Sequence, residues 1–335
     1  MNIYNYIKPK SNVYTGKHNK IETKIIHTIY DAKTLELDEL FGVDDQKKHY
    51  IQVVGLSDIE KISSIKDVYQ IDPLILEDIF NVNQRNKIEM KDAYLFCVFN
   101  LMYIENEQLK EDYMSLLMTK NTIITFHETE PTFLNPLKTL FEEYKELRER
   151  SIDFLFFQIL DIITDHHLDV YDHLDDQTIK FEEQILETKS IEQDAFYLIR
   201  KQMLKLKNNV SPVLEQLDKS IINTNHFRLE NQGYFDDLRD HLKRLDVRLT
   251  NSRELMHHLL DLHMNNQSTK MNKIMTTLTI FSAIFIPLSF MTGFFGMNFK
   301  HFDILEYPFA VGLFALICVM IVIGMILFFR RKHWF

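Results

Sequence analysis

The chain contains few of the residues that interrupt helices or cross-link a fold. Its 335 residues include only 8 glycines, 7 prolines and 2 cysteines. Because glycine and proline are the strongest helix breakers, their scarcity predicts long helices. The two cysteines, Cys97 and Cys318, both lie in apolar runs. The sequence therefore excludes a disulfide framework and a cysteine-based zinc site.

Basic residues are fewer than acidic ones. Lys and Arg number 38 against 48 Asp and Glu, which leaves a formal net charge of -10. No basic run is interleaved with aromatic residues, so a phosphate backbone would be repelled and nucleic acid is excluded as a partner. The N-terminal sequence MNIYNYIKPK lacks the apolar core of a secretory signal. We therefore expect the first large segment to stay in the cytoplasm.

Charge is missing altogether from two long segments near the C-terminus. The first runs from Ile274 to Phe299 and the second from Pro308 to Phe329. Each exceeds the roughly 20 residues that cross a hydrocarbon core, so both are predicted to be transmembrane helices. The alternative is a buried core helix, which runs of this length in a charge-rich chain disfavour.

The flanks of these segments predict their orientation. Lys270 and Lys273 precede the first, and the basic run Arg330–His333 follows the second, with Trp334 as an interfacial anchor. Basic residues favour the cytoplasmic side. The sequence therefore predicts a multi-pass protein of the cell membrane, with both termini in the cytoplasm and the short connection facing outward.

Residues 1–150 are expected to form a cytoplasmic α+β domain. Strand-like stretches lie at Tyr50–Val54, Ala93–Phe99 and Thr122–Phe126, separated by helical patterns. The segment Met114–Met118 pairs naturally with Thr122–Phe126 as a hairpin.

Residues 151–273 are expected to form a cytoplasmic helical stalk, because apolar residues there recur at spacings of three and four. Breaks are predicted at Pro212 and within Asn223–Gly233, and a single helix from Tyr234 to Ile286, roughly 80 Å long. The remaining boundaries are a first span at 274–297, an outer loop at 298–307, a second span at 308–329 and a basic tail at 330–335.

A polar stripe runs along the predicted long helix. At about 100° per residue, Asp261, Asn272 and Thr279 lie within roughly 20° of one another, and Met275, Ser282, Ile286 and Ser289 lie near the same face. Such a stripe is hard to satisfy in lipid and is expected to face other copies of the chain around a central axis.

The two spans contain no Asp, Glu, Lys, Arg or His. A proton relay or a carboxylate cage at the midplane is therefore excluded. Rings of neutral oxygens, such as those of Asn272 and Asn298, suit a hydrated hard cation such as Mg²⁺. Interhelical hydrogen bonding is the alternative role for these amides.

The segment Ile286–Phe299, with sequence IPLSFMTGFFGMNF, resembles the first-span signature of the CorA family. Its Gly-Met-Asn triplet stands at the outer end of the penultimate span, before a short loop, one more span and a basic tail. The soluble part carries two further similar motifs, Pro73–Ile79 and Asn83–Glu89. Asn83 and Asn86 replace a His and a Pro that are common in that family.

The resemblance implies a funnel-shaped homopentamer in the lipid bilayer that takes up Mg²⁺, and also Co²⁺ or Ni²⁺. Gly296, Met297 and Asn298 would form the selectivity filter, and Met275 and Leu278 a hydrophobic gate. The full implied pore lining is Asp261, Asn272, Met275, Leu278, Thr279, Ser282, Ile286 and Ser289.

The resemblance also implies regulation by intracellular Mg²⁺ bound between subunits, which would hold the closed state. The matching acids are Glu77, Asp78, Asp161 and Asp237. The outer loop is shorter than is typical, lacks the usual Met-Pro-Glu-Leu and has Lys300 where an acid is common. Asp303 and Glu306 are the acids left to attract cations there.

Two alternatives remain open: a zinc or other transition-metal transporter on the same scaffold, and a non-conducting membrane-anchored helical scaffold. His166, His167, His257, His258 and His263 suggest a soft-metal site only weakly. The sequence has no phosphate-binding glycine loop, nucleophile elbow or His-Glu-x-x-His pattern. We therefore expect neither an enzyme nor an organic cofactor, with divalent cations as the only small ligands.

Overall fold

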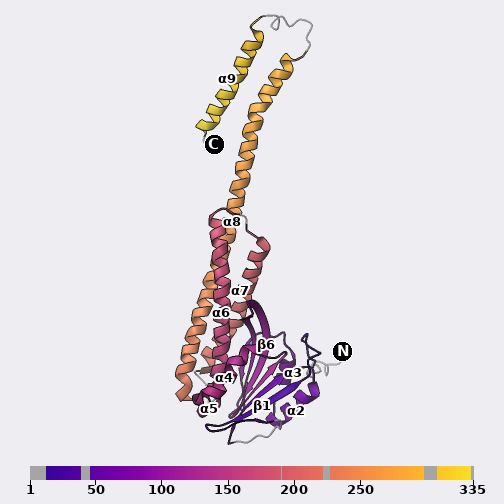
Figure 1. Ribbon diagram of the computed structural model, residues 1–335, viewed down its shortest axis with the longest axis vertical. Coiled ribbons are helices and arrows are strands. Elements are labelled where there is room, and N and C mark those ends of the chain that lie inside the picture. Colours follow the sequence, from indigo (N-terminus) through magenta and orange to yellow (C-terminus); the bar gives the residue numbers. More distant parts are fainter. Residues whose placement is uncertain (1–12, 39–45, 190, 222–226, 298–307, 333–335) are drawn as a thin grey trace, which may run out of the picture. The chain divides into compact units, whose positions relative to one another are not determined.

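The first part of the chain forms a seven-stranded mixed sheet (Figure 1). The computed structural model describes residues 13–38, 46–189, 191–221, 227–297 and 308–332. The strands are β1 (Lys24–Tyr30), β2 (Leu35–Asp38), β3 (Lys48–Val54), β4 (Lys87–Met90), β5 (Leu95–Glu105), β6 (Gln108–Met118) and β7 (Thr122–His127). Their spatial order is β2-β1-β3-β7-β6-β5-β4, and only β3 and β7 pair in parallel.

The hairpin predicted from the sequence is confirmed, since β6 and β7 pair antiparallel with Met118 opposite Ile123. The predicted strand Tyr50–Val54 lies within β3. The predicted strand Ala93–Phe99 is displaced, because β5 starts at Leu95 and continues to Glu105. Its second half pairs with β6 throughout, and this cross-strand partner extends a strand beyond its own apolar run.

Both faces of the sheet are covered by helices. Helices α2 (Ile59–Tyr69) and α3 (Pro73–Phe80) share one buried apolar cluster with alternate residues of β5, including Phe96 and Val98. Phe99, of opposite parity, lines a small cavity together with residues of α6 (Ile152–Leu186) and α7 (Gln193–Ile221). A strand buried on both faces accounts for the near-continuous apolar run in the sequence of β5.

The remaining elements are helical. They are two short 3-10 turns, Thr132–Leu134 and Leu229–Asn231, and the helices α4 (Asn135–Glu143), α5 (Lys145–Glu149), α8 (Gln232–Phe295) and α9 (Ala310–Arg331). The prediction of a single long helix over Tyr234–Ile286 is confirmed, and α8 extends past both ends of that interval, over Gly233 and Pro287.

The break predicted at Pro212 is wrong, because α7 continues through this residue. A proline inside a helix removes one backbone hydrogen bond and crowds the preceding turn. Here Val210, Val213 and Leu217 are buried on either side of it, and this packing keeps the helix intact. The other predicted break holds in the residues that are described, since 227–231 lie outside both α7 and α8.

The chain divides into two compact units, residues 1–184 with 190–257, and residues 185–189 with 258–335. In the second unit, α9 lies beside the C-terminal part of α8 (Figure 1), and the rings of Phe295 and Phe314 are 5.2 Å apart between centroids. Both helices are long and apolar enough to cross a membrane, and almost none of their apolar windows is buried.

Candidate functional site

Helix α3 positions two of the predicted regulatory acids, Glu77 and Asp78. Asp72 caps the helix by accepting a hydrogen bond from the Leu74 amide at 2.9 Å, and Pro73 occupies the first turn. The helix buries Ile75, Leu76, Ile79 and Phe80 in the core beneath the sheet. The acids lie on the remaining face, and both are partly exposed.

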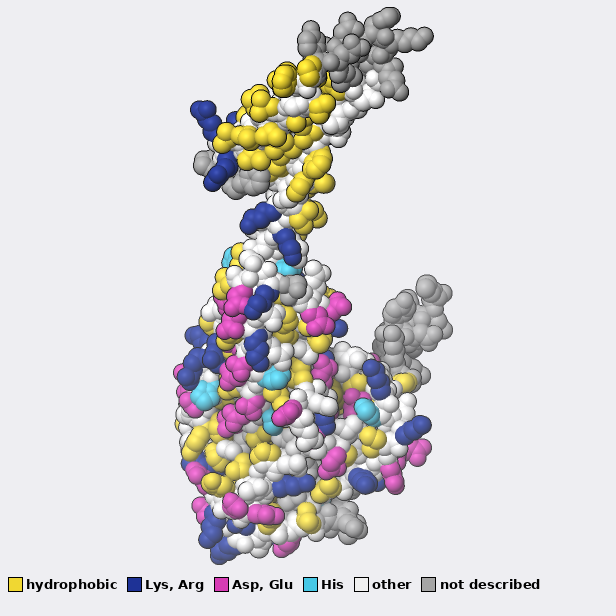
Figure 2. All heavy atoms as spheres, turned by 45° about the horizontal axis from the view of Figure 1, so that its top comes forward, with side chains coloured by type: hydrophobic (Ala, Val, Ile, Leu, Met, Phe, Trp, Pro, Cys, Tyr) yellow, Lys and Arg dark blue, Asp and Glu magenta, His cyan; other side chains and the backbone are white. Residues whose placement is uncertain are grey.

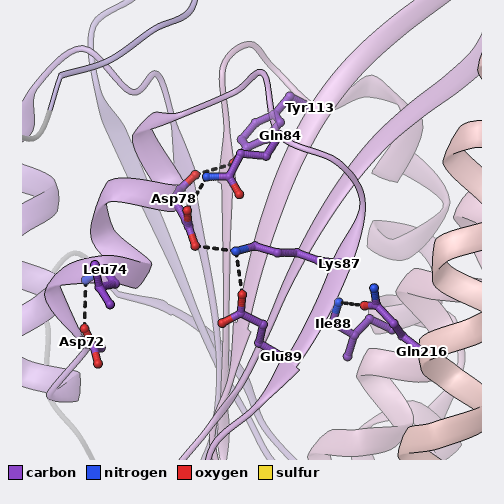
Figure 3. Close-up of polar contacts among 9 residues, drawn as sticks. All are labelled: Asp72, Leu74, Asp78, Gln84, Lys87, Ile88, Glu89, Tyr113 and Gln216. Atoms are coloured by element: carbon purple, nitrogen blue, oxygen red, sulfur yellow. Dashed lines mark hydrogen bonds and ion pairs between the residues drawn. The ribbon is translucent and has the colours of Figure 1, made fainter. Parts of the chain in front are cut away.

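The Asp78 carboxylate is already bonded within its own chain (Figure 3). One oxygen lies 2.5 Å from the Lys87 ammonium, and the other accepts a hydrogen bond from the Gln84 amide. Lys87 also pairs with Glu89 at 2.7 Å. Burial lowers the pKa of Lys87, but its hydrogen bonds to Asp78 and Glu89 outweigh burial and leave the pKa raised. Sequence reasoning quoted the motif that holds Gln84 and Lys87 but gave neither residue a role.

The other two predicted regulatory acids meet at a second place, between α6 and α8. Burial raises the pKa of Asp161, and the charges of Asp165 and Asp237 raise it further, while His241 opposes them. His241 and Asp237 are 3.8 Å apart. The structure thus brings Asp161 and Asp237 into one electrostatic cluster and adds Asp165 and His241. Asp161 and Asp165 are four residues apart on α6, and Asp237 and His241 are four residues apart on α8. This spacing places each pair on one helix face and could have been recognised in the sequence.

Carboxylates that crowd one another in this way favour a cation. Their oxygens suit Mg²⁺, which prefers hard oxygen ligands. Within the described parts of this chain, however, no group of three or more His, Cys, Asp or Glu residues is placed to hold a metal ion. The donor chemistry fits a divalent ion, but one copy of the chain supplies too few ligands, and Glu77 and Asp78 do not join the second cluster.

The predicted polar stripe lies along α8 in the second unit. All of its residues are exposed, and so is the predicted gate residue Leu278; the stripe consists of Asp261, Asn272, Met275, Thr279, Ser282, Ile286 and Ser289. The Thr279 hydroxyl donates to the Met275 carbonyl oxygen at 2.8 Å. That bond uses its proton and leaves oxygen lone pairs free to accept from water.

A different face of α8 is the covered one. Ile280 is buried, and Thr276, Ala283, Ile284, Pro287 and Leu288 are partly buried. At 100° per residue, Ser282 and Ser289 are nearly opposite Ile280, while Asn272 and Thr279 lie about 80–100° from Ile280 and only about 20–40° from Ala283. Within this unit, therefore, the neighbouring α9 does not cover the stripe.

The end of α8 carries two of the three predicted filter residues. The helix ends at Phe295, and the amide of Gly296 donates to the Thr292 carbonyl oxygen at 3.0 Å. A Cβ at position 296 would come within 2.9 Å of that same oxygen, so the close turn requires glycine. Asn298 and the predicted loop acids Asp303 and Glu306 lie outside the described residues.

The surface of the second unit is dominated by apolar side chains, with basic residues gathered at one end of the two apolar segments (Figure 2). In sequence these are Lys270 and Lys273 before the apolar part of α8, and Arg330, Arg331 and Lys332 at the end of α9. No charged residue occurs at 274–297 or at 309–329. An exposed apolar belt with basic residues at one end is typical of a membrane span.

Comparison with known proteins decides the family. Residues 49–331 match the family described as CorA-like Mg²⁺ transporter protein. The chain belongs to the CorA-like Mg²⁺ transporter family. This is a family of membrane transporters, and the resemblance predicted from the Gly-Met-Asn segment is confirmed.

Individual known proteins resemble the chain over about half of its length or more. It is 26% identical to the cobalt/magnesium transport protein CorA of Thermotoga maritima, over 98% of this chain and 97% of that protein. It is 27% identical to the zinc transport protein ZntB of Pectobacterium carotovorum over 52% of this chain and 54% of that protein. The complete structure of the CorA magnesium transporter from Methanocaldococcus jannaschii superimposes with a TM-score of 0.74 at 19% identity, covering 94% and 100% of the two chains.

The CorA fold is the coarse architecture expected from the sequence: an α+β soluble domain, a long helix and two apolar helices. Two kinds of candidate site stand on it. The first is a pair of separate carboxylate groups, at Asp78 and at Asp161 with Asp237. The second is the exposed stripe on α8.

Proposed function

We propose that several copies of this chain, five by the family resemblance, pack their α8 helices around a water-filled path for hydrated Mg²⁺. The stripe from Asn272 to Ser289 lines this path, and the Gly296-Met297-Asn298 segment forms its outer mouth. The observation that carries the proposal is that every residue of this stripe is exposed, while the covered face of α8 centres on the buried Ile280. Neutral hydroxyl and amide oxygens can hold a hydrated cation without stripping its water.

The same proposal places both termini in the cytoplasm. Five basic residues gather at one end of the apolar segments, and basic flanks face the cytoplasm. The segments 274–297 and 308–329 then span the bilayer, with residues 298–307 outside it. Residues 1–150 then form the cytoplasmic domain, and residues 151–273 form the cytoplasmic stalk.

We further propose that intracellular Mg²⁺ closes the path through the carboxylates of Glu77, Asp78, Asp161 and Asp237 at subunit contacts. Support comes from the surroundings of Asp161, because burial and then the charges of Asp165 and Asp237 raise the pKa of this acid above its usual range. Among the described residues of one chain, no group of three or more His, Cys, Asp or Glu is placed to hold a metal ion, and in this proposal a neighbouring copy supplies the further ligands. Loss of the bound ion leaves like charges facing one another and favours the open state.

The deciding experiment is flux into liposomes that contain the purified full-length chain. We expect Mg²⁺ to enter down its electrochemical gradient and hexa-ammine cobalt, a mimic of the hydrated ion, to block it. Asn298→Ala should abolish entry, whereas Thr277→Ala, exposed on α8 but about 100° or more around the helix from every residue of the stripe, should leave it unchanged. Equal flux in Asn298→Ala and the unsubstituted protein would remove the proposed filter.

Zinc is the second candidate cargo, because the chain also matches a zinc transport protein over about half its length. The same liposomes separate the two ions. Zinc entry that depends on a proton gradient and ignores internal Mg²⁺ would favour a zinc transporter. No entry of any divalent ion would favour a membrane-anchored scaffold.

A further inference from the structure

Asp78 differs from the other proposed regulatory acids because both of its carboxylate oxygens are bonded inside one chain. Lys87 lies 2.5 Å from one oxygen, and Gln84 donates a hydrogen bond to the other (Figure 3). Asp237, by contrast, is 73% exposed, and its ion-pair partner His241 is 3.8 Å away. A divalent ion that binds Asp78 therefore competes with these internal donors for the carboxylate.

Lys87 is held beside Asp78 by its own strand. On one side of it, the Asn86 amide donates to the Asn209 carbonyl oxygen of α7 at 2.8 Å. On the other side, the backbone amide of Ile88 donates to the Gln216 side chain, also of α7. These two bonds fix β4 on the helix. A tethered ammonium competes at a high local concentration, however dilute other cations are.

Glu89 gives the ammonium a second place to bind. Its carboxylate is 2.7 Å from the same Lys87 nitrogen. The side chains of Lys87 and Asp78 are both 22% exposed, while that of Glu89 is 38% exposed. Lys87 can therefore leave Asp78 and remain paired with Glu89, so the departure does not leave a half-buried charge without a partner.

We propose that Lys87 is the resident counter-ion of Asp78 and sets the Mg²⁺ concentration at which the regulatory site fills. The inference rests on the proposed function, in which Asp78 is a regulatory ligand. While the ammonium stays on Asp78, the carboxylate is neutralised and the site is weak. When the ammonium shifts to Glu89, the Asp78 oxygen that Lys87 held becomes available to a hard cation.

The test measures Mg²⁺ binding and flux on the same full-length protein. Binding is followed by calorimetric titration of the detergent-purified protein with MgCl₂, and flux by varying the Mg²⁺ inside liposomes. Lys87→Gln should bind Mg²⁺ about two- to fivefold more tightly, the range expected on removing a partly exposed ion pair. The internal Mg²⁺ that halves flux should fall by the same factor. Unchanged or weaker binding would overturn the inference.

Glu89→Gln provides a second test with the opposite sign. It leaves Lys87 in place but removes its alternative partner, so Mg²⁺ binding should weaken and half-inhibition should move to higher internal Mg²⁺. Lys110→Gln is the matched control, because it breaks another ion pair on the sheet, with Glu105, and should change neither value. Tighter Mg²⁺ binding by Glu89→Gln would contradict the exchange between the two acids.

The background variant Asp78→Asn separates this inference from the proposed function. In Asp78→Asn, adding Lys87→Gln should have no further effect on Mg²⁺ binding, and a persisting effect would show that Lys87 acts elsewhere. If the unsubstituted protein binds Mg²⁺ through Asp78 but shows no flux, the proposed function fails and the counter-ion role stands. If flux responds to internal Mg²⁺ but Lys87→Gln leaves binding unchanged, only the counter-ion role fails.

Discussion

The two units of the chain treat apolar and polar groups in opposite ways. In the first, Phe126 and Ile124 are completely buried, and acids such as Asp78 find partners in the same chain. In the second, Ile286 is 67% exposed and the hydroxyl of Ser289 faces outward from the same helix. The first unit therefore buries its large apolar side chains within one chain, while the second leaves apolar and polar side chains exposed on the same helix.

The largest expected effect on stability tests whether aromatic side chains contribute more in the first unit, where they are buried, than in the second, where they are exposed. Phe126→Ala removes a fully buried ring from the apolar cluster shared with α2 and α3. It should lower the free energy of unfolding by about 3–5 kcal/mol. Phe281→Ala removes a ring that is 59% exposed on α8 and should change thermal stability in detergent little. Thermal unfolding followed by circular dichroism compares the two variants. Equal losses of stability would contradict the difference in burial between the two units.

A smaller effect separates the lipid side of the second unit from the proposed water side. Leu316→Asp places a charge on exposed α9, where insertion should become less favourable by about 2.5–3.5 kcal/mol. Ser282→Asp places the same charge on the stripe, and the protein should still reach the membrane but with altered flux. Membrane yield by quantitative blotting is the measurement. If Ser282→Asp is lost from membranes as completely as Leu316→Asp, the stripe faces lipid.

The dependence of stability on pH tests the first unit alone. Burial lowers the pKa of His127 and of His167 to about 3. Both are neutral when folded and take up protons when unfolded, so stability is full above about pH 6.5 and falls on acidification towards 3. Each histidine should cost about 1.4 kcal/mol per pH unit in that window. Urea denaturation between pH 7.5 and 5.5 measures the slope.

Asp112 acts with the opposite sign, because burial raises its pKa to about 6. Its carboxyl binds a proton more readily when folded, so it adds stability as pH falls from 6 towards 4. One acid offsets only one of the two histidines. His127→Phe should therefore flatten the acid loss, and an unchanged slope in that variant would rule out His127 as its source.

An effect confined to one group of hydrogen bonds concerns the polar junction between β5 and α7. Asn86 is buried, accepts a hydrogen bond from the Asn100 amide at 2.6 Å and donates to the Asn209 carbonyl oxygen at 2.8 Å. Asn86→Ala removes the side chain that bonds the Asn100 amide and the Asn209 carbonyl oxygen. It should lower the free energy of unfolding by about 1–3 kcal/mol. Asn83→Ala, at an exposed position, should cost less than about 0.5 kcal/mol. Denaturation midpoints of the two variants provide the comparison.

Secondary structure could be predicted well where it depends on neighbouring residues in the sequence. The β6–β7 hairpin follows from two β-prone runs separated by three residues, the long helix α8 follows from the absence of breakers between Tyr234 and Ile286, and the structure contains both. The break predicted at Pro212 failed because buried neighbours outweigh a local propensity. The partners of Asp78 were out of reach for a related reason, since Lys87 stands on a strand whose position depends on the whole sheet.

The sequence alone determined two uncharged helices, a charge-rich part before them, a neutral stripe on one helix face and a Gly-Met-Asn segment at its end. Each of these features follows from the spacing and composition of residues along the chain. Only the tertiary structure decided that Asp161 meets Asp237 while Asp78 is bonded to Lys87. Such pairings depend on which faces of α6, α8 and β4 pack together, and no spacing along the chain encodes that choice.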